Sequence, residues 1–120
     1  MKITAKFASL LLRLDRALTQ LLFNKRTMFY HELAKLLGGY SPRSKWVACA
    51  LGMIVEADQE DGVPLRSSLI VRTDTLMPGD GYFWKLEEIG IIKDRTDASE
   101  CLKVWKDQMA KLGIAMPTPA

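Results

Sequence analysis

Residues 30–57 read YHELAKLLGGYSPRSKWVACALGMIVEA, and this stretch decides the fold that the sequence predicts. Apolar residues at helical spacing predict a helix over residues 31–37 and a second helix from about Pro42 to Ala57. Gly38-Gly39 favours the left-handed conformation that ends a helix, and Ser41-Pro42 is typical of a helix start. Two helices around a short glycine-containing turn have the outline of a helix-turn-helix. We expect these side chains of the second helix to face inward: Trp46, Val47, Ala50, Leu51, Ile54 and Val55.

Upstream, residues 4–24 predict a long amphipathic helix capped by Thr4. Residues 24–27 break its pattern, and Met28-Phe29 is long enough only for a bridging strand. We expect the apolar stripe of the helix over residues 4–24 to form the centre of the core. The alternative is that this stripe forms the interface of a dimer. The stripe comprises Ile3, Phe7, Leu10, Leu11, Leu14, Leu18, Leu21 and Leu22.

Downstream, residues 65–84 predict a β wing. Residues 65–73 have β character around Leu69-Ile70-Val71, residues 74–81 are rich in turn formers, and 82–84 are aromatic. A short helix is expected over residues 85–89. The last helix is predicted over 97–112, with Asp97 as N-cap, Glu100 completing a capping box and Gly113 ending it. Alternating prolines predict a flexible tail over 116–120.

These elements predict one domain over residues 1–115. The fold class is mainly α with a small β wing: a winged helix-turn-helix with an additional N-terminal helix and a C-terminal helix. The apolar run of residues 7–12 is too short for a signal peptide or a membrane span, so we expect no membrane contact. Cys49 and Cys101 match no metal spacing and are expected to be reduced core residues, which favours a cytoplasmic location.

Charge is distributed unevenly along the chain. Residues 1–55 hold nine Lys and Arg against Asp15 and Glu32, whereas residues 56–120 hold eight against twelve acidic side chains. This asymmetry is typical of a protein that presents one face to a polyanion, although solvated helix faces would produce it equally well.

The inventory of reactive side chains argues against catalysis. His31 is the one histidine, so a site with several imidazole ligands cannot form within one subunit. Cys49 lies in an apolar helix, the acidic residues 56–61 are expected to form a solvated loop, and no phosphate-binding glycine loop is present. We therefore expect no enzyme activity, no metal and no cofactor; an enzyme would need a site assembled between subunits.

The stretch Tyr30-His31-Glu32-Leu33-Ala34-Lys35-Leu36-Leu37-Gly38 resembles the Tyr-x-x-Leu-Ala-x-x-x-Gly opening of the DNA-binding domain of O6-alkylguanine-DNA alkyltransferases and alkyltransferase-like proteins. Val47-Ala48-Cys49-Ala50-Leu51 is similar to the family's Val-Gly-x-Ala-Leu helix. Pro64-Leu65-Arg66-Ser67 stands where the family has Pro-Cys-His-Arg, and Val71 and Gly79-Asp80-Gly81-Tyr82 resemble its valine and Gly-Gly-Tyr. The resemblance covers residues 30–82.

The departures from the family pattern remove its chemistry. Leu65 occupies the position of the nucleophilic cysteine and Arg66 that of the activating histidine. Alkyl transfer needs a thiolate there, so the resemblance implies a non-catalytic relative, in which Leu65 contacts a base or the pocket is filled. The family's arginine finger has no assigned counterpart, because Arg43 lies four residues before Val47 and Lys45 lies nearer. The family tyrosine that touches phosphate corresponds to Tyr30.

The sequence thus predicts sequence-tolerant binding of double-stranded DNA, with cations and a helix N-terminus against the phosphates. The alternative is a protein-binding module or inhibitor on the same scaffold, for example a phage or mobile-element accessory factor. The expected DNA-binding residues are Lys25, Arg26, Tyr30, Ser41, Arg43, Ser44, Lys45, Arg66 and Arg72.

Overall fold

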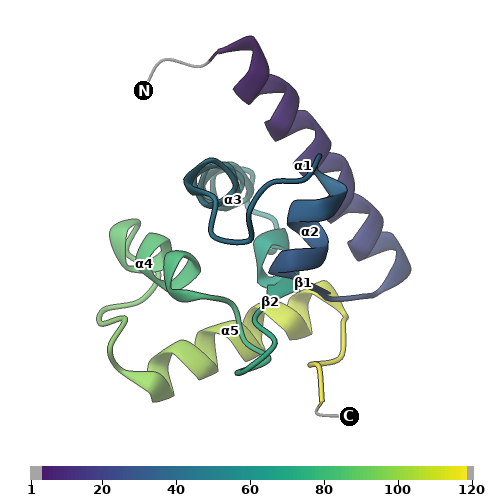
Figure 1. Cartoon of the computed structure of the whole chain (residues 1–120). Coiled ribbons are helices and arrows are strands. Elements are labelled where there is room, and N and C mark those ends of the chain that lie inside the picture. Colours follow the sequence, from purple (N-terminus) through teal and green to yellow (C-terminus); the bar gives the residue numbers. More distant parts are fainter. Residues whose placement is uncertain (1–3, 119–120) are drawn as a thin grey trace.

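A computed structural model describes residues 4–118, and it is mainly helical with one small sheet (Figure 1). The sheet pairs two short strands in parallel, with Met28 opposite Ile70 and Phe29 opposite Val71. In chain order the elements are α1 (Ala5–Asn24), β1 (Met28–Phe29), α2 (Tyr30–Leu36), α3 (Lys45–Glu60), the 3-10 helix η1 (Arg66–Leu69), β2 (Ile70–Val71), α4 (Asp80–Glu88) and α5 (Ala98–Leu112).

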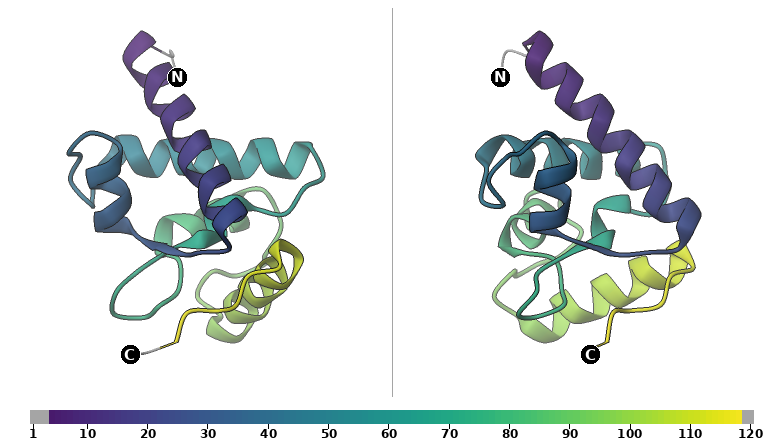
Figure 2. Two further views of the ribbon diagram at one scale, coloured as in Figure 1. Left: turned by 90° about the vertical axis from the view of Figure 1, so that its right-hand side faces the viewer. Right: turned by 45° about the vertical axis from the view of Figure 1, so that its right-hand side comes forward.

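The predicted N-terminal helix is confirmed as α1. The Thr4 hydroxyl oxygen accepts a hydrogen bond from the backbone N–H of Phe7 at 3.1 Å, and Lys25 ends the helix in the left-handed conformation. The apolar stripe faces the core; Ile3 lies outside the described residues. The N-terminal half of α1 projects beyond the other helices in every view (Figure 2). Neither α1 nor another helix of residues 4–118 is long and apolar enough to cross a bilayer.

The centre of the core is the segment η1–β2. Residues 67–71 are all buried, and η1 packs against α1, α3 and α5. The indole N–H of Trp105 in α5 donates to the carbonyl of Ser68 at 3.0 Å, and the Ser68 hydroxyl lies 2.6 Å from the Tyr82 hydroxyl in α4. Because buried polar groups need partners, these two bonds fix η1 between the last two helices.

The helix, turn and helix predicted for residues 30–57 are present, with different bounds. α3 begins at Lys45 and not at Pro42, because Ser41 starts a separate turn: its hydroxyl accepts the Arg43 N–H at 3.2 Å and its carbonyl accepts the Ser44 N–H at 2.9 Å. α3 also runs on to Glu60, so part of the expected acidic loop is helical. Trp46, expected to face inward, is 56% exposed.

The region predicted as a β wing is built differently. Residues 66–69 form a 3-10 turn, only Ile70 and Val71 pair as a strand, and the aromatic residues 82–84 lie in α4. Tyr82, Phe83 and Leu86 are buried while Trp84 is exposed, which is a helical and not an alternating pattern. The run of aromatic residues thus predicted the wrong periodicity.

The C-terminal helix is confirmed as α5, with the Asp97 carboxylate accepting the N–H groups of Ser99 and Glu100, and Gly113 at φ 71°. Glu100 does not close a capping box; its carboxylate accepts the N–H groups of Lys93 and Asp94. Of the predicted flexible tail, Met116 packs against the core, and residues 119–120 lie outside the described residues.

Candidate nucleic-acid interface

One open groove, with a volume of about 660 Å³, gathers several of the predicted DNA-binding residues. Its walls come from the start of α2, the turn before α3, the beginning of the 72–79 loop and the start of α4. Figure 2 shows the α2–α3 connection and the 72–79 loop on the same side of the molecule. The lining residues are Tyr30, His31, Pro42, Arg43, Arg72, Thr73, Asp74, Gly79, Asp80 and Gly81.

Tyr30 ties two walls of this groove together. Its hydroxyl oxygen accepts the backbone N–H of Gly79 at 2.8 Å, and a Cβ on Gly79 would lie 3.4 Å from that oxygen. Burial raises the pKa of Tyr30, against the opposing effects of the Gly79 hydrogen bond and the Arg72 charge. The phenol therefore stays neutral and keeps its own proton, which it can donate to an anion in the groove.

The charges in the groove are balanced. Arg43 and Arg72 are exposed on its walls, and so are Asp74 and Asp80. Arg72 and Asp74 form an ion pair at 2.7 Å with both side chains largely in solvent. Hydrogen bonding to Asp74 raises the pKa of Arg72, and the same bond lowers the pKa of Asp74. Both groups are therefore charged at neutral pH, and a polyanion would have to compete with Asp74 for Arg72.

Arg66 is directed into the protein. Its guanidinium contacts the Asp58 carboxylate at 2.9 Å, the Asp15 carboxylate at 2.8 Å and the Thr19 hydroxyl at 3.0 Å. Burial alone would lower the pKa of Arg66, but the hydrogen bonds that its guanidinium donates to Asp58 and Asp15 raise it. Arg66 therefore links α1 to α3 and lines no part of the groove.

Leu65 is 1% exposed and its backbone N–H donates to the Gln108 side chain at 2.8 Å. It packs within the hydrophobic core instead of standing at the mouth of a pocket.

The remaining predicted residues flank the groove or lie apart from it. Ser41 and Ser44 are the first and last residues of the turn that forms one wall, and Lys45 is exposed at the first position of α3. Lys25 and Arg26 are exposed in the turn between α1 and β1 and do not line the groove. The structure thus brings Tyr30, Arg43 and Arg72 together in the groove, whereas the other predicted cations, Lys25, Arg26, Lys45 and Arg66, do not line it.

Sequence reasoning missed the acidic half of the groove. The sequence predicts Asp74 and Asp80 only as turn residues, although the spacing of two residues between Arg72 and Asp74 is a signal that a local ion pair could form. It also missed a smaller hollow of about 110 Å³ between α3 and α4, which shares Tyr30, Gly79 and Gly81 with the groove. Small residues on the α3 face, Ala48 and Gly52, leave this space.

Among residues 4–118, no group of three or more His, Cys, Asp or Glu side chains lies close enough to hold a metal ion. Cys49 is half-buried, Cys101 is buried, and both are free thiols. Burial, followed by nearby carboxylates, raises the pKa of Cys101, which lowers its reactivity as a nucleophile.

Comparison with protein-family models, with curated proteins and with solved structures finds no match to this chain.

Proposed function

We propose that this chain is a non-catalytic, sequence-tolerant DNA-binding protein. It presents α2, α3 and the 72–79 loop as a variant of the winged helix-turn-helix, in which a loop replaces the wing hairpin. The observation that carries the proposal is the groove in which Tyr30, Arg43 and Arg72 converge from three separate segments. Cations and a neutral phenol around an open groove suit the phosphates and sugars of a DNA backbone.

The proposal includes the relationship to alkyltransferase-like proteins. The hydrogen bond from Gly79 to Tyr30 joins the first and last motifs that carry the resemblance. Leu65, in place of the nucleophile, is buried, and this supports binding without alkyl transfer.

The balanced charge of the groove sets the expected strength of binding. With Asp74 and Asp80 opposing Arg43 and Arg72, we expect affinity in the range of non-specific DNA binding, a Kd of about 10⁻⁴–10⁻⁶ M at physiological salt. Few phosphates are neutralised, so the slope of log K against log salt is expected to be shallow, between about −1 and −3.

The test is fluorescence anisotropy with labelled duplexes of about 20 bp and two unrelated sequences, measured across a salt series. Arg43→Glu/Arg72→Glu is expected to abolish binding to both. The matched control is Lys103→Glu/Lys106→Glu on α5, two exposed lysines that do not line the groove. An equal loss of DNA affinity in both double variants would mean that net charge, and not the groove, explains the effect. If the wild-type protein binds neither duplex at low salt, the proposal is wrong.

A protein-binding module is the second candidate, and two exposed tryptophans favour it. Trp46 and Trp84 are 56% and 53% exposed, and exposed aromatic residues are enriched at protein interfaces. In addition, Lys85 is paired with Glu56 and Glu88, and Arg66 with Asp58 and Asp15, so these cations already have acidic partners. A partner recovered with wild-type protein, insensitive to nuclease and lost with Trp84→Ala, would support this candidate over DNA.

A further inference from the structure

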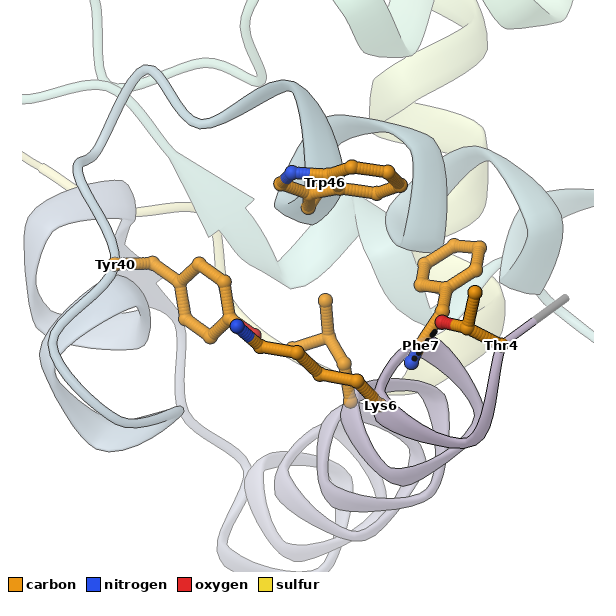
Figure 3. A pocket seen from close by; sticks show the side chains of 6 residues that line it. Thr4, Lys6, Phe7, Tyr40 and Trp46 are labelled. Atoms are coloured by element: carbon orange, nitrogen blue, oxygen red, sulfur yellow. Dashed lines mark hydrogen bonds between the residues drawn. The ribbon is translucent and has the colours of Figure 1, made fainter.

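An apolar pocket lies between the first turns of α1 and α3, outside the proposed DNA groove (Figure 3). Phe7 and Leu10 of α1, Tyr40 of the α2–α3 connection and Trp46 of α3 form its walls, with Thr4 and Lys6 on the rim. Its volume is about 120 Å³. Because an apolar cavity of about 150 Å³ holds one benzene ring, this pocket has room for one leucine-sized side chain.

Trp46 is the unusual member of this pocket. Its ring centroid lies 5.9 Å from that of Phe7, yet the residue is 56% exposed. Figure 3 shows the indole above the pocket, with Tyr40 and Phe7 on either side below it. A large aromatic ring left half in water beside a preformed apolar pocket has the features of an interface residue that becomes buried when a partner binds.

Two cations lie at the pocket and at the hollow next to it: Lys6 lines both, and Arg13 lines the second. A second hollow, of about 290 Å³, shares Lys6 and Tyr40 with it and is otherwise lined by Arg13, Leu37, Gly38 and Gly39. Of the residues that the structure describes, none that lines either hollow is acidic. No hydrogen bond or ion pair joins the Lys6 side chain to another residue within 4–118, so its ammonium group needs no release before it binds an anion.

Arg13 is held in position at this hollow. Its guanidinium donates to the carbonyl of Leu37 at 2.7 Å. Gly38 has φ +117°, and a Cβ there would lie 3.2 Å from the Arg13 Nη1 atom. The glycine therefore allows both the left-handed turn and the close approach of the guanidinium, whose other N–H groups remain available as donors.

We propose that these two hollows dock an acidic peptide segment of a partner protein. One large apolar side chain of that segment enters the pocket under Trp46, and neighbouring carboxylates contact Lys6 and Arg13. A carboxylate suits a guanidinium whose donors form a fork. A nucleobase would stack on Trp46, but Phe7 and Leu10 offer no hydrogen-bond partner to the donors and acceptors on its edges.

The test uses the ¹⁵N-labelled chain of 120 residues and three capped peptides: Glu-Glu-Leu-Glu-Glu, Glu-Glu-Ala-Glu-Glu and Lys-Lys-Leu-Lys-Lys. We expect the first peptide to shift the amide resonances of Lys6, Gly39 and Tyr40 and the indole resonance of Trp46. Binding of the alanine and lysine peptides is expected to be weaker by at least about fivefold, because each removes one of the two contacts. Equal binding of all three peptides would overturn the proposal.

Variants separate the site from general charge effects. Lys6→Glu and Trp46→Ala are each expected to lower the affinity for Glu-Glu-Leu-Glu-Glu by about fivefold or more. Lys103→Glu, which changes an exposed lysine on α5, is expected to leave this affinity unchanged. Shifts of the same resonances by single-stranded oligothymidine but not by the acidic peptide would assign the site to nucleic acid and overturn the proposal. If wild-type protein binds no peptide, and if Ile3→Ala alone changes the Trp46 indole resonance, the N-terminal segment of the chain itself fills the pocket. That result would overturn the proposal.

Discussion

Arg66 and Arg72 stand at the two ends of the segment η1–β2, and they play opposite parts in the molecule. Arg66 points inward to Asp58, whose side chain is 3% exposed, while Arg72 points outward to Asp74, whose side chain is 59% exposed. The sequence predicted both arginines as DNA contacts on a wing. The comparison teaches that the burial of the carboxylate partner decides whether an arginine holds the fold together or is available to a ligand.

The largest expected effect in this comparison is the loss of Arg66. Arg66→Ala leaves the buried Asp58 carboxylate without its cation, and removing one partner of a buried ion pair costs about 3–5 kcal/mol. Urea unfolding followed by circular dichroism measures this, with Arg72→Ala as the matched control. Arg72→Ala is expected to change the free energy of unfolding by less than about 0.5 kcal/mol, since its pair is exposed. Similar losses in the two variants would remove the distinction between the arginines.

The next largest effect is expected for Leu65→Cys, which changes the buried residue directly before η1. Shortening a side chain that is 1% exposed is expected to lower the free energy of unfolding by about 1–2 kcal/mol. The new thiol is expected to stay unreactive toward a chromogenic disulfide reagent in native protein and to react once urea unfolds the chain. A thiol that reacts as fast as an exposed one, or any transfer of an alkyl group from alkylated DNA, would contradict the buried position of residue 65.

Tyr82 tests the contact of η1 with α4 through pH. Burial raises the pKa of Tyr82 above 10, although its hydrogen bond with Ser68 acts in the opposite direction. In the unfolded chain the phenol ionises near pH 10, while in the folded protein it stays protonated, so the unfolded state binds fewer protons there. The ionisation of Tyr82 therefore leaves the free energy of unfolding unchanged below pH 10. Above pH 10 it lowers this free energy by at most about 1.4 kcal/mol per pH unit.

The measurement is the urea midpoint between pH 8 and about pH 11, for wild type and Tyr82→Phe. The phenylalanine variant is expected to lose stability at neutral pH, because Ser68 loses its partner, and to show a smaller alkaline decline. An unchanged alkaline slope would mean that Tyr82 is not the group responsible.

The elements that the sequence predicted well carry their own local signals. Thr4, Asp97 and Gly113 mark the ends of α1 and α5, and the apolar stripes of both helices have one period throughout. Such caps depend on neighbours within a few residues, so the sequence alone is sufficient to find them. Met28-Phe29 was likewise predicted as a bridging strand because the run is too short for more.

The failures involve partners that are distant in sequence. Arg66 pairs with Asp15, which lies 51 residues away in the sequence, and no local sequence pattern predicts that contact. The sequence predicts residues 82–84 as the end of a wing because they follow a strand-like segment and a turn-rich segment, but burial of Tyr82, Phe83 and Leu86 against the core selects a helix. The groove has the same origin: Tyr30 and Gly79 meet only after the chain has folded, so the sequence could name Tyr30 but not its neighbour.

The smallest expected effect concerns the exposed end of the comparison, the pair of Arg72 and Asp74. Asp74→Asn removes the carboxylate that competes with phosphate for Arg72, so duplex DNA is expected to bind about two- to fivefold more tightly, while the free energy of unfolding changes by less than about 0.5 kcal/mol. Asp107→Asn on α5 is the control, because Asp107 is exposed and does not line the groove. Anisotropy titrations at low salt compare the three proteins. If Asp74→Asn and Asp107→Asn increase affinity equally, the gain comes from net charge and Arg72 is not at the interface. If only Asp74→Asn increases it, Arg72 contacts DNA, because the substitution frees the exposed guanidinium that Asp74 otherwise holds in an ion pair.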